Sequence, residues 1–312
     1  MEKSIQLLNA LVDNIGNVIH GKDDKIRLII ASWLAGGHVL LEDVPGTGKT
    51  LLCKALAKSV ELDFHRAQFT PDLLPSDLTG TMIFDQEANK FKFLKGPLHT
   101  VIFLVDEINR ATPRTQSALL ESMAERQMTI DNRHYKLHDL FFVLATQNPV
   151  EQHGTFPLPE AQLDRFLIKL SLGYPSVKAE LKMAKERVKS DPFESVKVVA
   201  KEDDIRSLKK QIDNVSIKDE VYQYVLDIVN GTREHIDLQV GASPRATLAL
   251  VKLGQAVSFM NGHDHLRPSV IHELAPFVLG HRILLTAEAR YQGETTENII
   301  ENILSKVKTP TL

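Results

Sequence analysis

The stretch VLLEDVPGTGKT, residues 39–50, joins an apolar run typical of a strand to a glycine-rich turn and the start of a helical pattern. In loops of this composition, backbone N–H groups at a helix N-terminus point at phosphate oxygens, a lysine reaches the β and γ phosphates, and a Ser or Thr hydroxyl binds Mg²⁺. We therefore expect a phosphate-binding loop made of Val44, Pro45, Gly46, Thr47, Gly48, Lys49, Thr50 and Leu51.

Asp43 stands where the common pattern G-x-x-x-x-G-K-[ST] has its first glycine. A carboxylate about 4 Å from a phosphate charge would cost roughly 4 kcal/mol at an effective dielectric constant near 20. We therefore expect the Asp43 side chain to point away from the phosphates and to bond nearby backbone in an Asx-type turn. The alternative is a contact with a neighbouring segment or subunit.

The composition narrows the class of protein. The 312 residues are 43% hydrophobic and 25% charged, which suits one large or two modest globular domains. A formal net charge of −3 gives no overall positive field for nucleic acid or anionic membranes. The single cysteine, Cys53, excludes an internal disulfide and is expected to be a small core residue. No apolar run approaches the ~20 residues of a membrane span, so we expect a soluble, cytoplasmic protein.

The first part of the chain reads as an α/β domain. Short apolar runs alternate with helical patterns, which predicts a mostly parallel sheet covered on both faces. After the turn residues 173–176 the strand pattern fades, so we place one domain at 1–175 and a helical domain at 176–312. The predicted strands are 38–41, 63–67, 101–105, 141–145 and 166–170.

The second part reads as a small helical bundle. Ser216 to Asp219 has the form of a capping box, and an apolar stripe from Ile217 to Val229 runs up to Gly231. Further helices are expected at 178–190, 245–259, 268–289 and 296–307.

Two segments of the first domain alternate like hairpin strands. One is formed by residues 82–85 and 90–94, and the other by residues 128–130 and 134–137 around the turn 131–133.

Polar side chains follow the strands that end at the expected site. Asp106 and Glu107 close the apolar run 101–105, and Asn148 follows the run 141–145. Ligands of open α/β folds bind at the carboxyl edge of the sheet. We expect Asp106 to bind Mg²⁺ together with Thr50, and Glu107 to act as the base that orients water. Asn148 is expected to bond the water or the γ-phosphate, whereas its alternative role is that of a turn former.

Four longer motifs carry a resemblance to a known family. They are LEDVPGTGKT, LVDEINRATPRTQSALLESMAERQMTID, ATQNPVEQHGTFPLPEAQLDRF and GASPRA, and together they resemble the MoxR family of AAA+ ATPases. The resemblance implies a P-loop NTPase core with a parallel five-stranded sheet between helices on both faces, followed by a C-terminal all-helical lid domain. It also makes an acidic residue before V-P-G ordinary, because MoxR proteins commonly show one.

The resemblance implies roles for individual residues. Lys49 and Thr50 match Walker A, Asp106 and Glu107 match Walker B, and Asn148 matches sensor 1. Arg165 matches the arginine finger that acts on the adjacent subunit, and Arg245 matches sensor 2; the two hairpins match the helix-2 insert and the pre-sensor-1 hairpin. Arg110 and Arg114 are alternatives to Arg165, and a structural salt bridge is the alternative for each. Ser243 and Pro244 are typical of a helix start, which places Arg245 in the first turn of a helix. The helix dipole disfavours a cation there, and a bound anion would offset that cost.

The resemblance also implies a function. It predicts Mg²⁺-dependent ATP hydrolysis in a homo-oligomeric ring, typically a hexamer. The expected role is that of a chaperone that matures or assembles partner complexes, with partners that carry von Willebrand factor A domains and with metal insertion in some cases. Two alternatives stay open. One is a nucleic-acid remodelling motor, which the acidic net charge disfavours, and the other is a nucleotide-gated scaffold with little hydrolysis.

Overall fold

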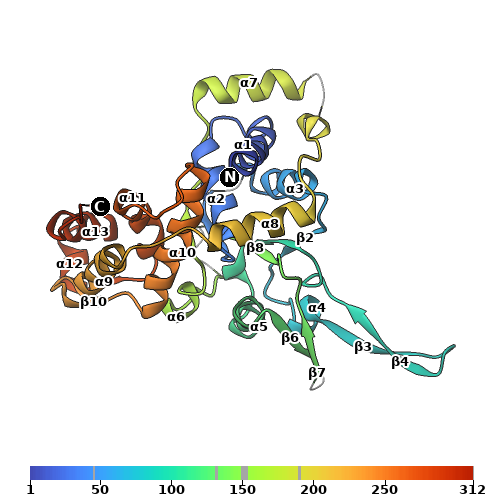
Figure 1. Cartoon of the computed structure of the whole chain (residues 1–312). Coiled ribbons are helices and arrows are strands. Elements are labelled where there is room, and N and C mark those ends of the chain that lie inside the picture. Colours follow the sequence, from blue (N-terminus) through green and yellow to red (C-terminus); the bar gives the residue numbers. More distant parts are fainter. Residues whose placement is uncertain (45, 131–132, 149–153, 189–190, 312) are drawn as a thin grey trace.

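A computed structural model describes residues 1–44, 46–130, 133–148, 154–188 and 191–311 (Figure 1). Its centre is a five-stranded sheet with the order β2, β5, β8, β1, β9, in which all neighbours are parallel. Each strand overlaps one of the predicted apolar runs, so the α/β fold class is confirmed. The strands are β1 (Val39–Glu42), β2 (Phe64–Gln68), β5 (Ile102–Asp106), β8 (Phe142–Gln147) and β9 (Ile168–Leu170).

Both faces of the sheet are covered by helices. Successive side chains of a strand point to opposite faces, so the two faces contribute to different buried clusters. Leu40 belongs to one buried cluster, whereas its neighbours Val39 and Leu41 belong to the other. The cluster of Leu40 lies against α4 (Pro75–Thr79), η1 (Ile108–Arg110) and α5 (Pro113–Glu125). The opposite cluster packs on α1 (Glu2–Gly16), α2 (Asp23–Leu34) and α3 (Lys49–Ser59). Cys53 is buried in this second cluster, as expected, and burial raises the pKa of its thiol.

Both expected hairpins are present and lie on the same side of the molecule (Figure 1). The longer one, β3 (Gly80–Asp85) with β4 (Lys90–Lys95), extends beyond the body of the fold, and β6 (Gln127–Ile130) with β7 (Arg133–Lys136) lies beside it. The rings of Phe93 and Tyr135 stack with centroids 4.7 Å apart and join the two hairpins.

The second half of the chain is helical, as expected, and adds one short antiparallel ribbon, β10 (Leu238–Val240) with β11 (Leu284–Leu285). The expectation of purely helical structure missed this ribbon, whose strands are too short to give an alternating pattern. The helices are α7 (Val177–Arg187), η2 (Pro192–Ser195), α8 (Glu202–Asp213), α9 (Asp219–Glu234), α10 (Pro244–Met260), α11 (Pro268–Leu279), α12 (Ala287–Tyr291) and α13 (Thr296–Lys306). The short α6 (Glu160–Leu163) precedes β9.

Three helix limits differ from the sequence prediction. The helix expected over 268–289 ends at Leu279, and Arg282, just beyond it, donates to the carbonyl groups of Phe166 and Leu167 before β9. Ser216 is no capping residue: α9 begins at Asp219 without a side-chain cap, and the Ser216 hydroxyl donates to the Asp264 carbonyl. Gly231 does not end α9, which continues to Glu234. Its missing Cβ instead leaves room for Ile303 of α13, which would lie 2.8 Å from such an atom.

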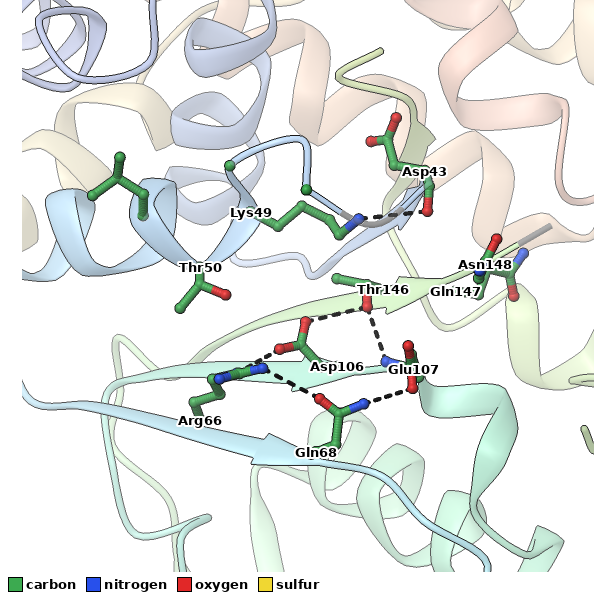
Figure 2. Close-up of a pocket in the computed structure, with 13 residues that line it drawn as sticks. Asp43, Lys49, Thr50, Arg66, Gln68, Asp106, Glu107, Thr146, Gln147 and Asn148 are labelled. Atoms are coloured by element: carbon green, nitrogen blue, oxygen red, sulfur yellow. Dashed lines mark hydrogen bonds and ion pairs between the residues drawn. The ribbon is translucent and has the colours of Figure 1, made fainter. Parts of the chain in front are cut away.

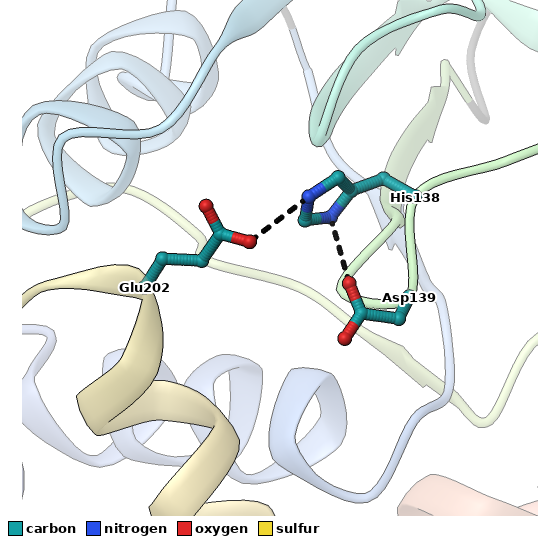
Figure 3. Close-up of side chains that lie close together, drawn as sticks. All are labelled: His138, Asp139 and Glu202. Atoms are coloured by element: carbon teal, nitrogen blue, oxygen red, sulfur yellow. Dashed lines mark ion pairs between the residues drawn. The ribbon is translucent and has the colours of Figure 1, made fainter.

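Helix α8 was not predicted, and an ion-pair cluster fastens it to the loop before β8 (Figure 3). The His138 ring lies 3.3 Å from an Asp139 oxygen and 3.1 Å from a Glu202 oxygen. These three side chains are close enough to share a metal ion. Arg206 pairs with both carboxylates, however, so the cluster already holds a cation and we assign it a structural role.

The two halves of the chain share one apolar cluster. It runs from the α1, α2 and α3 side of the sheet through α8 into α9, α10, α11 and α13. The limit between the domains at residue 175 remains a prediction. Within the described ranges, no helix combines the length and apolar character needed to cross a membrane.

Candidate nucleotide-binding site

A cavity of about 370 Å³ opens at the carboxyl ends of β1, β5 and β8 (Figure 2). Because the strands are parallel, their ends bring together residues that lie far apart in the sequence. The cavity is lined by Asp43, Gly46, Gly48, Lys49, Thr50, Leu51, Arg66, Gln68, Asp106, Glu107, Thr146, Gln147 and Asn148.

The phosphate loop has the backbone that its glycines predict. Gly46 and Gly48 have φ values of 88° and 90°, in the left-handed region that favours glycine. Helix α3 begins at Lys49 and has no side-chain cap, so its first N–H groups are free of a capping side chain. Such a terminus attracts anions through its N–H groups and its dipole. Of the predicted loop residues, Pro45 lies outside the described residues.

Lys49 folds back onto its own loop. Its Nζ donates to the Val44 carbonyl at 2.8 Å and lies 3.4 Å from both the Asp43 carbonyl and the Thr47 hydroxyl. Burial lowers the pKa of Lys49, and the carboxylates of Asp43, Asp106 and Glu107 oppose that shift. A phosphate entering the cavity would therefore meet an ammonium group that is held at the loop by neutral carbonyl oxygens.

The Asp43 carboxylate is buried and points away from Lys49 (Figure 2). It accepts hydrogen bonds from the Ser171 hydroxyl at 2.7 Å and from the N–H groups of Leu172 and Gly173 at 2.7 and 2.9 Å. The expected Asx-type turn within its own loop is therefore wrong. The alternative, a contact with a neighbouring segment, is what the structure has, because β9 lies next to β1 and ends at residue 170.

Asp106 and Glu107 meet different partners at the end of β5. Asp106 is buried; one oxygen lies 2.5 Å from Nε of Arg66, and the other accepts from the Thr146 hydroxyl at 3.4 Å. Glu107 has a φ of 58°, which a residue other than glycine adopts at a cost of order 1 kcal/mol. Its N–H donates to the Thr146 hydroxyl at 2.9 Å.

The Glu107 carboxylate is held on one oxygen by two donors. Nε2 of Gln68 lies 2.6 Å from it, and Nη1 of Arg110 lies 3.0 Å from it. Arg66 also reaches Gln68, at 3.3 Å, so β2 supplies a polar pair that contacts both acids of β5 (Figure 2).

Sequence reasoning missed Arg66, Gln68 and Thr146. Arg66 and Gln68 are two residues apart in β2, so they share one face of the strand, and Gln68 pairs in register with Asp106. Two polar side chains at this spacing were a usable signal, but only the strand order places β2 beside β5.

Thr50 and Asp106 both line the cavity, and a hydroxyl with a carboxylate is a donor set that suits Mg²⁺. Asn148, at the end of β8, is buried and lines the same cavity. The structure therefore brings together Lys49, Thr50, Asp106, Glu107 and Asn148 at one cavity, and their roles remain predictions.

The two remaining predicted arginines lie elsewhere. Nη1 of Arg165 donates to the Leu120 carbonyl at 2.9 Å, and its side chain lines a separate cavity of about 520 Å³ beside α5. Arg245 is exposed in the first turn of α10, with Nη1 3.7 Å from Asp164. Asp164 also accepts from Ser243 at 2.8 Å and from the buried Arg282 at 2.8 Å. Among the described residues that line the nucleotide cavity, Arg66 is the only arginine.

Comparison with known proteins agrees with this geometry. The sequence profile of the "ATPase family associated with various cellular activities (AAA)" matches residues 38–168, and that of an "AAA lid domain" matches residues 230–303. "Chaperone MoxR1" of Mycobacterium tuberculosis (strain ATCC 25618 / H37Rv) is 36% identical over 98% of this chain and 83% of its own length. The "Uncharacterized protein YeaC" of Bacillus subtilis (strain 168) is 49% identical over 97% of this chain and 95% of its own.

A solved structure shares the fold over almost the whole chain. The crystal structure of a candidate ATPase from Cytophaga hutchinsonii ATCC 33406 superposes with a TM-score of 0.92 at 41% sequence identity. The match covers 99% of this chain and 98% of that one.

Proposed function

This chain belongs to the MoxR family of AAA ATPases, and we propose that it binds ATP with Mg²⁺ in the cavity of Figure 2 and hydrolyses the ATP. The observation that carries the proposal is the meeting of the phosphate loop and the acids of β5 at one cavity. The loop offers the N–H groups of a helix start that no side chain caps, together with the Lys49 ammonium group, to the phosphates. Thr50 and Asp106 would hold the metal.

The proposed reaction gives distinct roles to Lys49, Glu107 and Asn148. Lys49 would leave the Val44 carbonyl and donate to the terminal phosphates, because phosphate oxygens are charged acceptors and the carbonyl is not. Bound Mg²⁺ supplies positive charge that offsets the charge of the phosphate oxygens. Glu107 would orient a water molecule for in-line attack on the γ-phosphorus and accept its proton. Asn148 would hydrogen-bond the water or the γ-phosphate.

We extend the proposal to an assembly in which neighbouring subunits complete each site. Its support is the place of Arg165, which lines the cavity beside α5 and not the nucleotide cavity of its own chain. An arginine at the γ-phosphate typically accelerates hydrolysis by 10³ to 10⁵. Arg165 of an adjacent subunit would supply it in a ring, which we propose is a hexamer, and Arg245 would contact the nucleotide once it leaves Asp164.

We further propose that hydrolysis serves a chaperone activity on partner proteins. Its support is the relative named as a chaperone and the projecting β3–β4 hairpin, where Phe84 and Phe91 are exposed. Exposed apolar side chains on a projecting ribbon are typical of partner contacts. On resemblance alone, the proposal includes partners with von Willebrand factor A domains and metal insertion into partner complexes.

Nucleotide binding and turnover test the proposal. The purified protein is expected to bind a fluorescent ATP analogue more tightly with Mg²⁺ than without it. Lys49→Ala should weaken that binding about 30-fold, since a charge-assisted hydrogen bond contributes about 2 kcal/mol. Glu107→Gln should keep the affinity and lower phosphate release at least about 100-fold, as loss of a general base does.

The same measurements contain the outcomes that contradict the proposal. Absence of Mg²⁺-dependent ATP binding would contradict the assignment of this cavity as a nucleotide site. Phosphate release by Glu107→Gln at the rate of the unaltered protein would remove Glu107 from the role of base. Tight binding with negligible turnover in the unaltered protein would favour the nucleotide-gated scaffold, and stimulation by DNA would favour the nucleic-acid motor.

A further inference from the structure

Arg66 places a cation of the protein beside the acid that the proposed function assigns to Mg²⁺. Its Nε lies 2.5 Å from Oδ2 of Asp106, and both residues line the cavity (Figure 2). The other oxygen of Asp106 accepts from the Thr146 hydroxyl. Both oxygens of the carboxylate are therefore engaged, and one of them is neutralised by a full positive charge.

A divalent ion and the Arg66 guanidinium compete for this carboxylate. Asp106 is buried, so its charge has little solvent around it and is well balanced by one close cation. A metal ion bound directly to the same carboxylate would lie a few ångströms from the guanidinium, where two positive charges repel. Direct metal binding to Asp106 is consequently disfavoured while Arg66 stays beside the carboxylate.

Arg66 has room to move away from the carboxylate. Its side chain is 49% exposed, whereas the Asp106 side chain is 10% exposed, so the arginine has solvent to move into and the buried acid does not. Its remaining hydrogen bond, from Nη2 to Gln68, is long at 3.3 Å. A lysine at this position would hold the acid less firmly, because it lacks the fork of planar donors that an arginine offers.

We propose that Arg66 occupies the cation position of Asp106 in the nucleotide-free protein and that a divalent ion displaces it when the ion arrives with nucleotide. A metal ion alone must displace Arg66 without compensation. An ion bound to nucleotide brings phosphate oxygens, which are both additional metal ligands and an anionic partner for the released guanidinium. Arg66 is thus a positioning residue that makes metal binding depend on nucleotide, and this inference rests on the proposed function.

The test measures metal affinity without nucleotide. Mn²⁺ is titrated into the nucleotide-free protein, and free Mn²⁺ is followed by its electron paramagnetic resonance signal. Arg66→Gln should bind Mn²⁺ at least about fivefold more tightly than the unaltered protein, and Arg66→Lys should give an intermediate affinity. The double variant Arg66→Gln with Asp106→Asn should not show this gain in Mn²⁺ affinity, because the Asp106 carboxylate that would bind the ion is no longer present.

Arg290→Gln is the matched control, since it removes the same charge from an exposed arginine of α12, away from the cavity. It should leave Mn²⁺ affinity unchanged. Thermal melting of each variant, followed by circular dichroism, checks that the fold is retained. An equal gain for Arg290→Gln, or no gain for Arg66→Gln, would overturn the inference.

Linkage gives a second readout with the fluorescent ATP analogue. Coupling between two ligands is reciprocal. If Arg66→Gln raises the metal affinity fivefold without nucleotide and leaves it unchanged with nucleotide, the factor by which Mg²⁺ raises nucleotide affinity becomes fivefold smaller. The ratio of Kd values without and with Mg²⁺ should fall by that factor in Arg66→Gln. If the unaltered protein shows no Mg²⁺-dependent binding, the proposed function fails. If it shows normal binding and the ratio is unchanged in Arg66→Gln, only the role of Arg66 fails.

Discussion

At the level of single residues, Asp43 links the phosphate loop to the strand beside it. Its carboxylate accepts two backbone N–H groups and one hydroxyl from residues 171–173, directly after β9. The loop is thereby anchored at the point where it leaves β1. The carboxylate thus fixes the position of the loop and points away from the Lys49 ammonium group (Figure 2).

Asp43→Asn should destabilise the fold with little effect on nucleotide affinity. The side-chain amide nitrogen introduced by the substitution would face a hydrogen-bond donor, because both oxygens of Asp43 accept hydrogen bonds. A buried N–H group left unpaired costs about 2 kcal/mol. We expect the free energy of unfolding in urea to fall by about that amount, while the Kd of the fluorescent ATP analogue changes less than about threefold. Asp63→Asn, at an exposed site, is the control for loss of charge. A large change of Kd with unchanged stability would contradict this reading.

Some residues of the candidate site can be predicted from the local sequence, and others cannot. Gly46, Gly48 and Lys49 were predictable because a phosphate loop is built from one continuous stretch between a strand and a helix. Arg66 was not, since its partner Asp106 lies 40 residues further along the chain and becomes a neighbour only through the order of the strands. The contact of Arg245 with Asp164 depends in the same way on packing between the two halves.

At the level of secondary structure, the strands were easier to predict than the helices that cover them. A strand buried on both faces, such as β5, reads as an unbroken apolar run. Helix α8 was missed although Ile205, Leu208 and Ile212 follow helical spacing and are buried. Charged residues fill the rest of this helix, and its contacts with α2 and α10 are set by tertiary packing.

Helix α8 also carries a charge whose burial opposes folding. Burial lowers the pKa of Lys209 to about 8, from an ordinary value of 10.5. The unfolded chain therefore holds this proton more tightly than the folded chain does. The resulting penalty is fully present below pH 8 and disappears as the pH rises from 8 to 10.5.

Lys209→Met should remove this penalty. At pH 7 the variant is expected to gain on the order of 2 kcal/mol in the free energy of unfolding, because the apolar side chain needs no solvation. The gain should shrink as the pH approaches 10.5, where the unaltered protein no longer carries the charge. Urea unfolding at several pH values measures it, with the exposed Lys210→Met as control. A gain that does not depend on pH would contradict the assignment to Lys209.

For the proposed ring, mixing of inactive variants tests whether a site is shared between subunits. Lys49→Ala and Arg165→Ala should each abolish most phosphate release when assayed alone. In an equimolar mixed ring, about one interface in four pairs an intact Lys49 with an intact Arg165 of the neighbour, so about a quarter of the activity should return. If Arg165 acted within its own chain, the mixture would stay inactive, because no single chain carries both residues.

The continuous apolar cluster limits how this chain can be divided. Ile26 and Ile29 of α2 lie in the same buried cluster as Leu250 and Leu253 of α10, and the two helices are in contact. A fragment truncated after residue 175 would present these isoleucines to water and would be prone to precipitate during expression. The same contact ties the two halves together, so any movement of one half relative to the other would have to keep these apolar side chains away from water.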